Sequence, residues 1–180
     1  MTAKKGFTLS EVLVVCVLTV VVFTSVLGVF VMGKSLYVSS MAGQEAQRDA
    51  GLIMSKIIKG PEGGATRYGL RSAAGFTPPT SINSIAYTGA DGNARSFYLS
   101  SGSIFYQSPT ESPTTQTLYS PPANTAVTLW FWEPVTSGGS PVYADHEMLS
   151  VYVAVTKTLS AGKTVSGSIS TSVNVRNLPK

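Results

Sequence analysis

Cysteine and histidine are almost absent from this sequence, which has one of each among 180 residues. A single cysteine, Cys16, excludes a disulfide within the chain, so the fold must be held together by its core. Because Cys16 lies among valines and leucines, we expect it to pack as a small apolar side chain rather than to act in redox chemistry. His146 stands between two acidic residues, and we interpret it as a solvated loop residue rather than a metal ligand.

Motifs of the common catalytic sites are missing as well. The sequence has no nucleophile elbow, no His-Glu-x-x-His pair and no phosphate-binding loop. The stretch 91–93, Asp-Gly-Asn, looks like part of a calcium loop, but it lacks the glutamate at the required spacing, so we interpret it as a hairpin turn. We therefore predict that the protein is not an enzyme, requires no cofactor and binds no metal.

Charged residues are scarce, at 12% of the chain, and the formal net charge is +4. Together with 43% apolar residues, this composition fits a membrane-anchored protein rather than a disordered one. Near the C-terminus there are four scattered basic residues, Lys157, Lys163, Arg176 and Lys180, which are few for a nucleic-acid-binding surface. We therefore do not expect nucleic acid as a partner, and a steep salt dependence of DNA binding would revive that alternative.

A long apolar run lies near the N-terminus. The 21 residues from Val12 to Met32 carry no charge, and about 20 apolar residues suffice for a helix to span a bilayer. The run is longer than the apolar core of a secretory signal, which has about 7 to 15 residues. Lys4 and Lys5 should hold its N-terminal end on the cytoplasmic side. The sequence thus predicts a single-pass anchor with the C-terminal region outside the cytoplasm.

Glu11 is unusual, because a carboxylate at the rim of a spanning helix is costly unless it is paired. The basic residues, then Gly6, Phe7 and Glu11 four residues after the phenylalanine, followed by a long apolar helix, resemble the leader of type IV pilins and type II secretion pseudopilins. The resemblance implies that a prepilin peptidase cuts between Gly6 and Phe7 and N-methylates the new Phe7 amine. It also implies that Glu11 of one subunit pairs with the Phe7 amine of its neighbour. An uncleaved signal anchor, with Glu11 at the headgroups, is the alternative.

The resemblance further implies the partners and the location of the chain. These are other pilins or pseudopilins, contacted through the N-terminal helix, and an inner-membrane assembly platform. The protein would reside in a bacterial inner membrane and assemble into a pilus or a pseudopilus. Removing the leader would take away Lys4 and Lys5 and leave a net charge of about +2.

Beyond Lys34 the helix is expected to continue and to become amphipathic. Apolar residues recur at spacings of three and four, which is typical of a helix with one buried face. We expect this face to contain Tyr37, Met41, Ala46, Ala50, Ile53, Met54, Ile57 and Ile58. A basic residue, a glycine and a proline follow at 59–61 and predict the end of the helix there.

A two-residue period replaces the helical one after about residue 81. Residues 60–81 read as a connecting loop and 108–125 as a long surface loop. Between them we predict a three-stranded antiparallel meander through 82–87, 94–99 and 103–107. Strands over 126–132, 149–159 and 165–175 complete the sheet. In the first of these, Leu129 and Phe131 face opposite to Trp130 and Trp132, so one pair should enter the core.

The predicted fold is α+β and pilin-like, with a long N-terminal helix packed on an antiparallel sheet. We expect a leader at 1–6, a membrane-spanning helical half at 7–33, an amphipathic half at 34–59 and a globular β domain at 60–180. The meander and the ending 170–178 resemble the J-type minor pseudopilins and related minor pilins. The predicted function is that of a structural subunit, minor pilin or pseudopilin. The alternative is an adhesin or a DNA-binding tip subunit of a competence-type pilus.

Overall fold

The computed structural model describes residues 6, 8–61, 68–111, 113–133 and 148–174, with the backbone alone at 78, 80 and 161. The chain divides into two compact units, residues 1–41 and residues 42–180. Helix α1, Leu9–Lys59, begins in the first unit and ends in the second.

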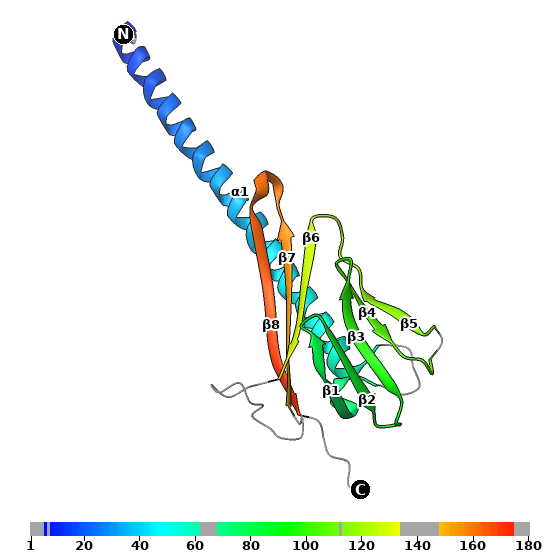
Figure 1. The fold of residues 1–180 in the computed structure, drawn as a ribbon. Helices are drawn as coiled ribbons and strands as arrows, with labels where there is room; N and C mark the ends of the chain where they lie inside the picture. Colours follow the sequence, from blue (N-terminus) through cyan, green and yellow to red (C-terminus); the bar gives the residue numbers. More distant parts are fainter. Residues whose placement is uncertain (1–5, 7, 62–67, 112, 134–147, 175–180) are drawn as a thin grey trace. The chain divides into compact units, whose positions relative to one another are not determined.

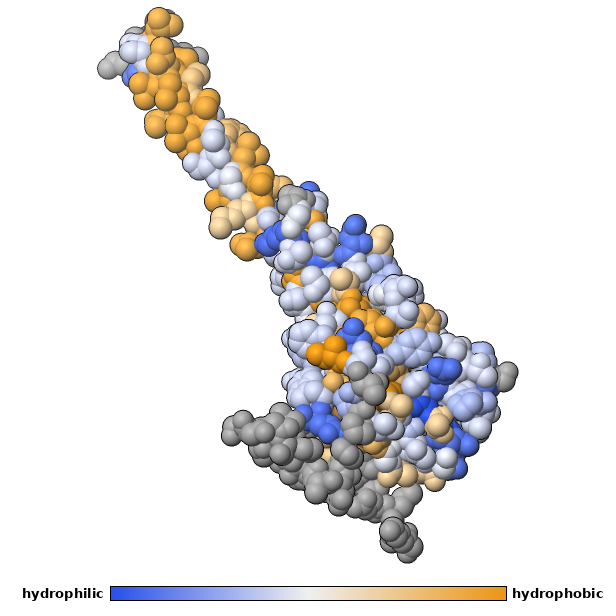
Figure 2. Space-filling model, viewed as in Figure 1, coloured by the Kyte–Doolittle hydropathy of each residue, from blue (hydrophilic) through white to orange (hydrophobic). Residues whose placement is uncertain are grey.

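The first unit is the N-terminal part of α1. Its apolar side chains are exposed along the whole run, as Val14 at 55%, Phe23 at 65% and Val29 at 74% illustrate. Figure 2 shows this stretch as a nearly continuous hydrophobic surface interrupted by a few pale, polar side chains. α1 is long and apolar enough to cross a membrane. Surface of this kind is stable only when lipid or other apolar helices cover it.

The C-terminal part of α1 is amphipathic, as its sequence pattern predicts. Its buried side chains are Ala42, Ala46, Ala50, Ile53, Met54 and Ile57. The helix stops at Lys59 because Gly60 adopts a positive φ of 97° and donates its N–H to Lys56 O, which is a C-terminal cap that only glycine adopts easily. The predicted face is wrong in its first turns, since Tyr37 and Met41 are 64% and 45% exposed. A Cβ built at Gly43 would lie 3.2 Å from a Val165 methyl group, so the β7–β8 hairpin packs on the helix at this position.

Within the residues that the structure describes, eight strands form two antiparallel sheets beside this helix (Figure 1). The five-stranded sheet has the order β1-β2-β3-β4-β5, and the three-stranded sheet has the order β6-β7-β8. A short 3-10 turn, η1, precedes β1, and another, η2, joins β7 to β8. The bounds are η1 Leu70–Ser72, β1 Ala73–Ser81, β2 Ser84–Gly89, β3 Ala94–Ser100, β4 Ser103–Gln107, β5 Thr115–Tyr119, β6 Thr125–Trp132, β7 Met148–Thr158, η2 Ser160–Gly162 and β8 Thr164–Asn174.

In strand β6, buried side chains alternate with more exposed ones from Val127 to Trp132. Leu129 and Phe131 are buried at 0% and 1% exposure, whereas Trp130 and Trp132 are exposed at 42% and 39%. The prediction that one of these pairs enters the core is confirmed, and the buried pair is Leu129 and Phe131. On the outer face, the Trp130 ring stacks on Tyr152 of the neighbouring strand with centroids 5.2 Å apart.

The five-stranded sheet corrects two predictions. The meander over β2, β3 and β4 is confirmed, but it gains a strand on each side, because β1 lies in the predicted loop 60–81 and β5 in the predicted loop 108–125. Both additions are edge strands. An edge position tolerates the Pro78-Pro79 pair of β1, since proline removes only N–H groups that a ladder does not need. The predicted single sheet is likewise wrong, because β6 starts a second sheet.

Both sheets bury their apolar faces against the C-terminal part of α1 and share one core. Gly167 of β8 lies directly on the helix backbone at Ala46 and Gln47. From the other sheet, Leu118 O accepts a hydrogen bond from Lys56 Nζ at 3.2 Å. The two sheets meet where Phe131 N–H donates to Ile82 O at 2.8 Å. The architecture is therefore α+β and pilin-like, with a long N-terminal apolar helix packed on antiparallel sheets, as predicted.

Candidate functional site

The start of α1 is built as a reciprocal cap. The helix begins at Leu9, so Thr8 is the N-cap residue and Glu11 is the third residue of the first turn. Thr8 N–H and Thr8 Oγ1–H both donate to Glu11 Oε2, at 2.8 and 2.9 Å. In return, Glu11 N–H points to Thr8 Oγ1 at 3.4 Å. This capping box satisfies backbone N–H groups that a helix start otherwise leaves unpaired.

The capping role of Thr8 and Glu11 was missed in the sequence, although its signal was present as Thr-x-x-Glu before an apolar run. The resemblance gives Glu11 a partner on a neighbouring subunit, and the alternative places it at the headgroups; neither includes this contact within its own helix. Its second oxygen, Oε1, has no hydrogen bond to any residue that the structure describes. The carboxylate therefore has one oxygen engaged at its own helix start and one available.

Gly6 stands just before this cap in open space. A Cβ built there has no heavy atom within 4 Å among its non-neighbouring residues. The fold itself thus places no steric demand for glycine at this position. Phe7, the predicted new N-terminus, lies outside the described residues.

The polar side chains of the apolar segment are satisfied within the helix. Thr19, Thr24 and Ser25 donate their hydroxyls to the carbonyls four residues earlier, at 2.7, 2.8 and 2.8 Å. In a bilayer no water is present to satisfy such groups, so this internal bonding lowers the cost of burying them in lipid. Cys16 is a free, exposed thiol among these side chains.

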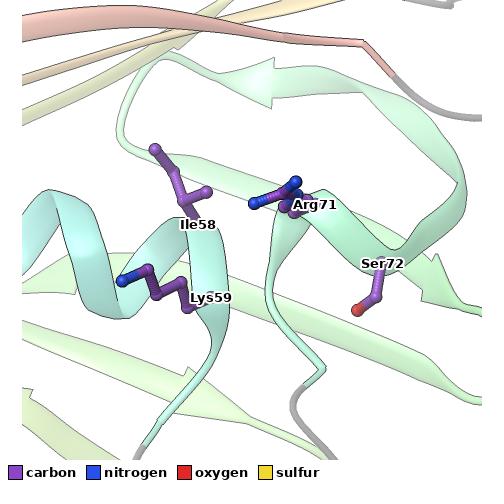
Figure 3. Close-up of a pocket in the computed structure, with 4 residues that line it drawn as sticks. All are labelled: Ile58, Lys59, Arg71 and Ser72. Atoms are coloured by element: carbon purple, nitrogen blue, oxygen red, sulfur yellow. The ribbon is translucent and has the colours of Figure 1, made fainter.

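One pocket that described residues line in the globular unit lies at the C-terminal end of α1. Figure 3 shows the hollow at the C-terminal end of α1, lined by Ile58, Lys59, Arg71 and Ser72. Its volume of about 220 Å³ is smaller than the 300 to 1,000 Å³ typical of ligand sites. In the part of the chain that the structure describes, no three His, Cys, Asp or Glu side chains gather as a metal site would require. His146 lies outside that part.

The most buried charged group is Arg95, at 3% exposure. Its guanidinium makes a bidentate ion pair with Asp91, at 2.6 and 2.7 Å, and donates to Tyr106 Oη at 2.9 Å. Glu111 accepts from Tyr106 Oη at 2.8 Å. The Arg95 Cζ atom also lies 3.6 Å above the centre of the Tyr68 ring. This cluster ties the β2–β3 turn to β4 and to the segment before η1.

The ionisation of this cluster agrees with a structural role. Hydrogen bonds from Arg95 hold the pKa of Asp91 well below its usual range. Burial raises the pKa of Tyr106 to about 12, and the hydrogen bond to Glu111 adds to the shift. Each charge has a close partner, which is the condition for burying charge without loss of stability. One weak signal in the sequence indicates this burial: Arg95 stands two residues before Phe97, on the same face of β3, and both are buried.

Of the basic residues considered for nucleic-acid binding, the structure describes Lys157 and Lys163. Lys157 Nζ is held by Glu45 at 2.9 Å and by Asp49 at 3.4 Å, so its charge is neutralised within the fold. Lys163 is exposed on the β7–β8 hairpin. Arg176 and Lys180 lie outside the described residues.

One comparison with known proteins identifies the N-terminal segment. Residues 1–27 match the family model described as the prokaryotic N-terminal methylation motif. No curated protein and no solved structure matches the chain. The matched segment contains Gly6, Phe7 and Glu11. It implies membrane anchoring, cleavage by a prepilin peptidase and assembly with other pilins. The motif and the long apolar helix together support a structural subunit of the pilin or pseudopilin type.

Proposed function

We propose that the protein is made as a precursor, is cut between Gly6 and Phe7 on the cytoplasmic face of a bacterial inner membrane, and is N-methylated on Phe7. Residues 1–6 are then the leader, 7–33 the membrane-spanning half of the helix, 34–59 its amphipathic half and 60–180 the globular domain. The observation that carries this proposal is the methylation motif, whose 27 residues include the cleavage junction. The glycine supports it further, because no described residue lies close enough to require glycine at position 6 and a protease cleft does favour a residue without a side chain.

Assembly follows from the exposed apolar surface of α1 and from Glu11. After cleavage, Glu11 Oε2 keeps its bonds to Thr8 while Oε1 accepts a hydrogen bond from the Phe7 amine of a neighbouring subunit. The apolar side chains of the helix then pass from lipid to the helices of other subunits, which requires no exposure to water. An inner-membrane platform would carry out this transfer. Among filament subunits we propose a minor one, of the J type, on the resemblance of residues 170–178.

Processing is tested by N-terminal mass spectrometry of the membrane-bound protein from cells with and without the prepilin peptidase. We expect a chain that begins with N-methylated Phe7 in the first cells and with Met1 in the second. Gly6→Val should accumulate as precursor, whereas Ala3→Val, a similar enlargement upstream of the junction, should be processed normally. A wild-type chain that begins at Met1 in both strains, or one cut at a junction other than Gly6–Phe7, would contradict the proposal.

A further inference from the structure

The three-stranded sheet has an outer face, which is turned away from the C-terminal part of α1. The odd-numbered positions of the sheet point toward the core and the helix, as the buried Leu129 and Phe131 of β6 show. On β8 the same holds for Ile169, whose methyl group lies 3.6 Å from a Cβ built at Gly51 of α1. The even-numbered positions of β6, β7 and β8 therefore share the outer face.

Three aromatic side chains stand together on this outer face. Trp130 of β6 lies opposite Tyr152 of β7, and their rings stack with centroids 5.2 Å apart. Trp132 follows two positions later on β6, which places it about 7 Å further along the same face. The two tryptophans are 42% and 39% exposed. Large aromatic rings that remain exposed side by side on a regular strand indicate a binding surface rather than part of the core.

The rest of the outer face is uncharged and rich in hydroxyl groups. The only charged residue in β6, β7 and β8 is Lys157, which stands at an odd-numbered position and pairs with two carboxylates of α1. Next to the aromatic rings, the hydroxyl groups of Ser150 and Ser172 are hydrogen-bonded at 3.1 Å. The hydroxyl-bearing residues around the rings are Thr128, Ser150, Ser168, Ser170 and Ser172. The face thus combines aromatic rings on one side with neutral hydroxyl groups on the other.

We infer that this outer face binds a neutral polysaccharide, built of sugar rings with equatorial substituents, whose rings pack on Trp130 and Trp132. Such a ring has an apolar side of C–H groups and a rim of hydroxyl groups. The C–H groups carry a partial positive charge and match the negative face of an aromatic ring. The rim hydroxyls both donate and accept hydrogen bonds, as the serine hydroxyls beside the rings do. The inference goes beyond the proposed function and does not depend on it, because every residue involved belongs to the unit 42–180.

The charge and composition of the face favour this partner over other classes. Nucleic acid also stacks on aromatic rings, but its phosphates require lysine or arginine, which the outer face lacks. A lipid surface is bound through lysine or arginine together with bulky apolar side chains. Serine, which forms most of the β8 side of the face, is depleted at protein interfaces. A partner that is uncharged and rich in hydroxyl groups matches the face in both charge and hydrogen bonding.

Intrinsic fluorescence tests the inference directly, because Trp130 and Trp132 are the only two tryptophans in the chain. Full-length protein, in a detergent without a sugar headgroup, is titrated with cellohexaose and with N-acetylated chitohexaose. Both are neutral oligosaccharides of equatorial sugar rings. We expect a saturable shift of the emission to shorter wavelength with at least one of them, because a stacked sugar removes water from the exposed rings. Oligothymidine, which is charged, should cause no shift.

Two variants and a matched control locate the binding. Tyr152→Ala removes the ring stacked on Trp130 and keeps both fluorescent residues, and we expect it to weaken the affinity at least about tenfold. Tyr98→Ala is the control, because it removes a tyrosine stacked on Phe105 at 5.4 Å in the other sheet, and it should leave the affinity unchanged. If Tyr152→Ala does not fold, as judged by its melting temperature in detergent, Trp132→Ala replaces it with Trp130 as the remaining reporter, and the same loss is expected.

Three results would overturn the inference. The first is the absence of a shift with both oligosaccharides, and the second is an equal shift with oligothymidine. The third is an affinity that the folded variants of the outer face leave unchanged. The N-terminal residue of the processed chain tests the proposed function separately, so either conclusion can fail without the other.

Discussion

Replacing Gly167 by alanine tests how closely β8 packs against α1. A Cβ at this position would lie 2.3 Å from Gln47 N and 2.6 Å from Ala46 C, both of which are backbone atoms that cannot rotate away. To reach an ordinary contact, helix and strand must separate by roughly 1 Å, which loosens the packing around Ala46. Overpacking of a core costs about 1 to 3 kcal/mol, and we expect the upper end because backbone must move.

A loss of about 3 kcal/mol should lower the melting temperature of a chain of this size by about 6 to 12 °C. The assay is thermal unfolding of the full-length protein in detergent, followed by circular dichroism. Gly51→Ala is the matched control, because its Cβ would meet only the Ile169 methyl group at 3.6 Å and alanine favours the helix by up to about 1 kcal/mol. We expect Gly51→Ala to be neutral or stabilising. If Gly167→Ala has the same melting temperature as the wild type, β8 does not pack against the helix backbone as described.

Three further outcomes follow from the core, the buried tyrosines and the N-terminal cap. Ile53→Asp places an unpaired charge at a position with 1% exposure and should lower the free energy of unfolding by several kcal/mol, out of a total of about 5 to 15. An unchanged denaturation midpoint would show that this face of the helix is not packed. Burial raises the pKa of Tyr87 and raises that of Tyr106 to about 12, so unfolded tyrosines lose protons at a lower pH than folded ones. The free energy of unfolding that these tyrosines contribute should therefore be fully present below about pH 10 and fall above it. Tyr106→Phe should weaken this fall, as measured by urea titrations between about pH 9 and 12. Glu11→Ala should leave cleavage and membrane insertion intact and reduce incorporation into sheared filaments on an immunoblot, whereas normal incorporation would favour a tip position, where Glu11 has no neighbour to meet.

The helix and most strands were predictable because their signals are local. The spacing of Ala46, Ala50, Ile53 and Ile57 defines one helical face, and the glycine at position 60 marks the end. Where the helix face becomes buried was not predictable in this way. It depends on which helix residues the strands contact, and these contacts join segments that are far apart in the sequence.

The missed strands and the missed cluster depend on contacts far apart in the sequence. Pro78-Pro79 reads as a loop signal, and only the pairing of β1 with β2 shows that an edge strand accommodates it. The division into two sheets rests on which strands become neighbours, which alternation alone does not encode. Arg95 is buried because Asp91, Tyr106 and Glu111 converge on it from three segments. The cap at Thr8 differs from these features, since its motif is local and could have been recognised in the sequence.

The central claim is that this chain works as an assembled, processed filament subunit. The most direct measurement is mass spectrometry of the N-terminal peptide of this protein in filaments sheared from cells and separated from membranes. The claim predicts that the protein is present there and that its chain begins with N-methylated Phe7. Absence from the filaments while the membrane fraction holds the protein, or a chain in the filaments that begins at Met1, would contradict it.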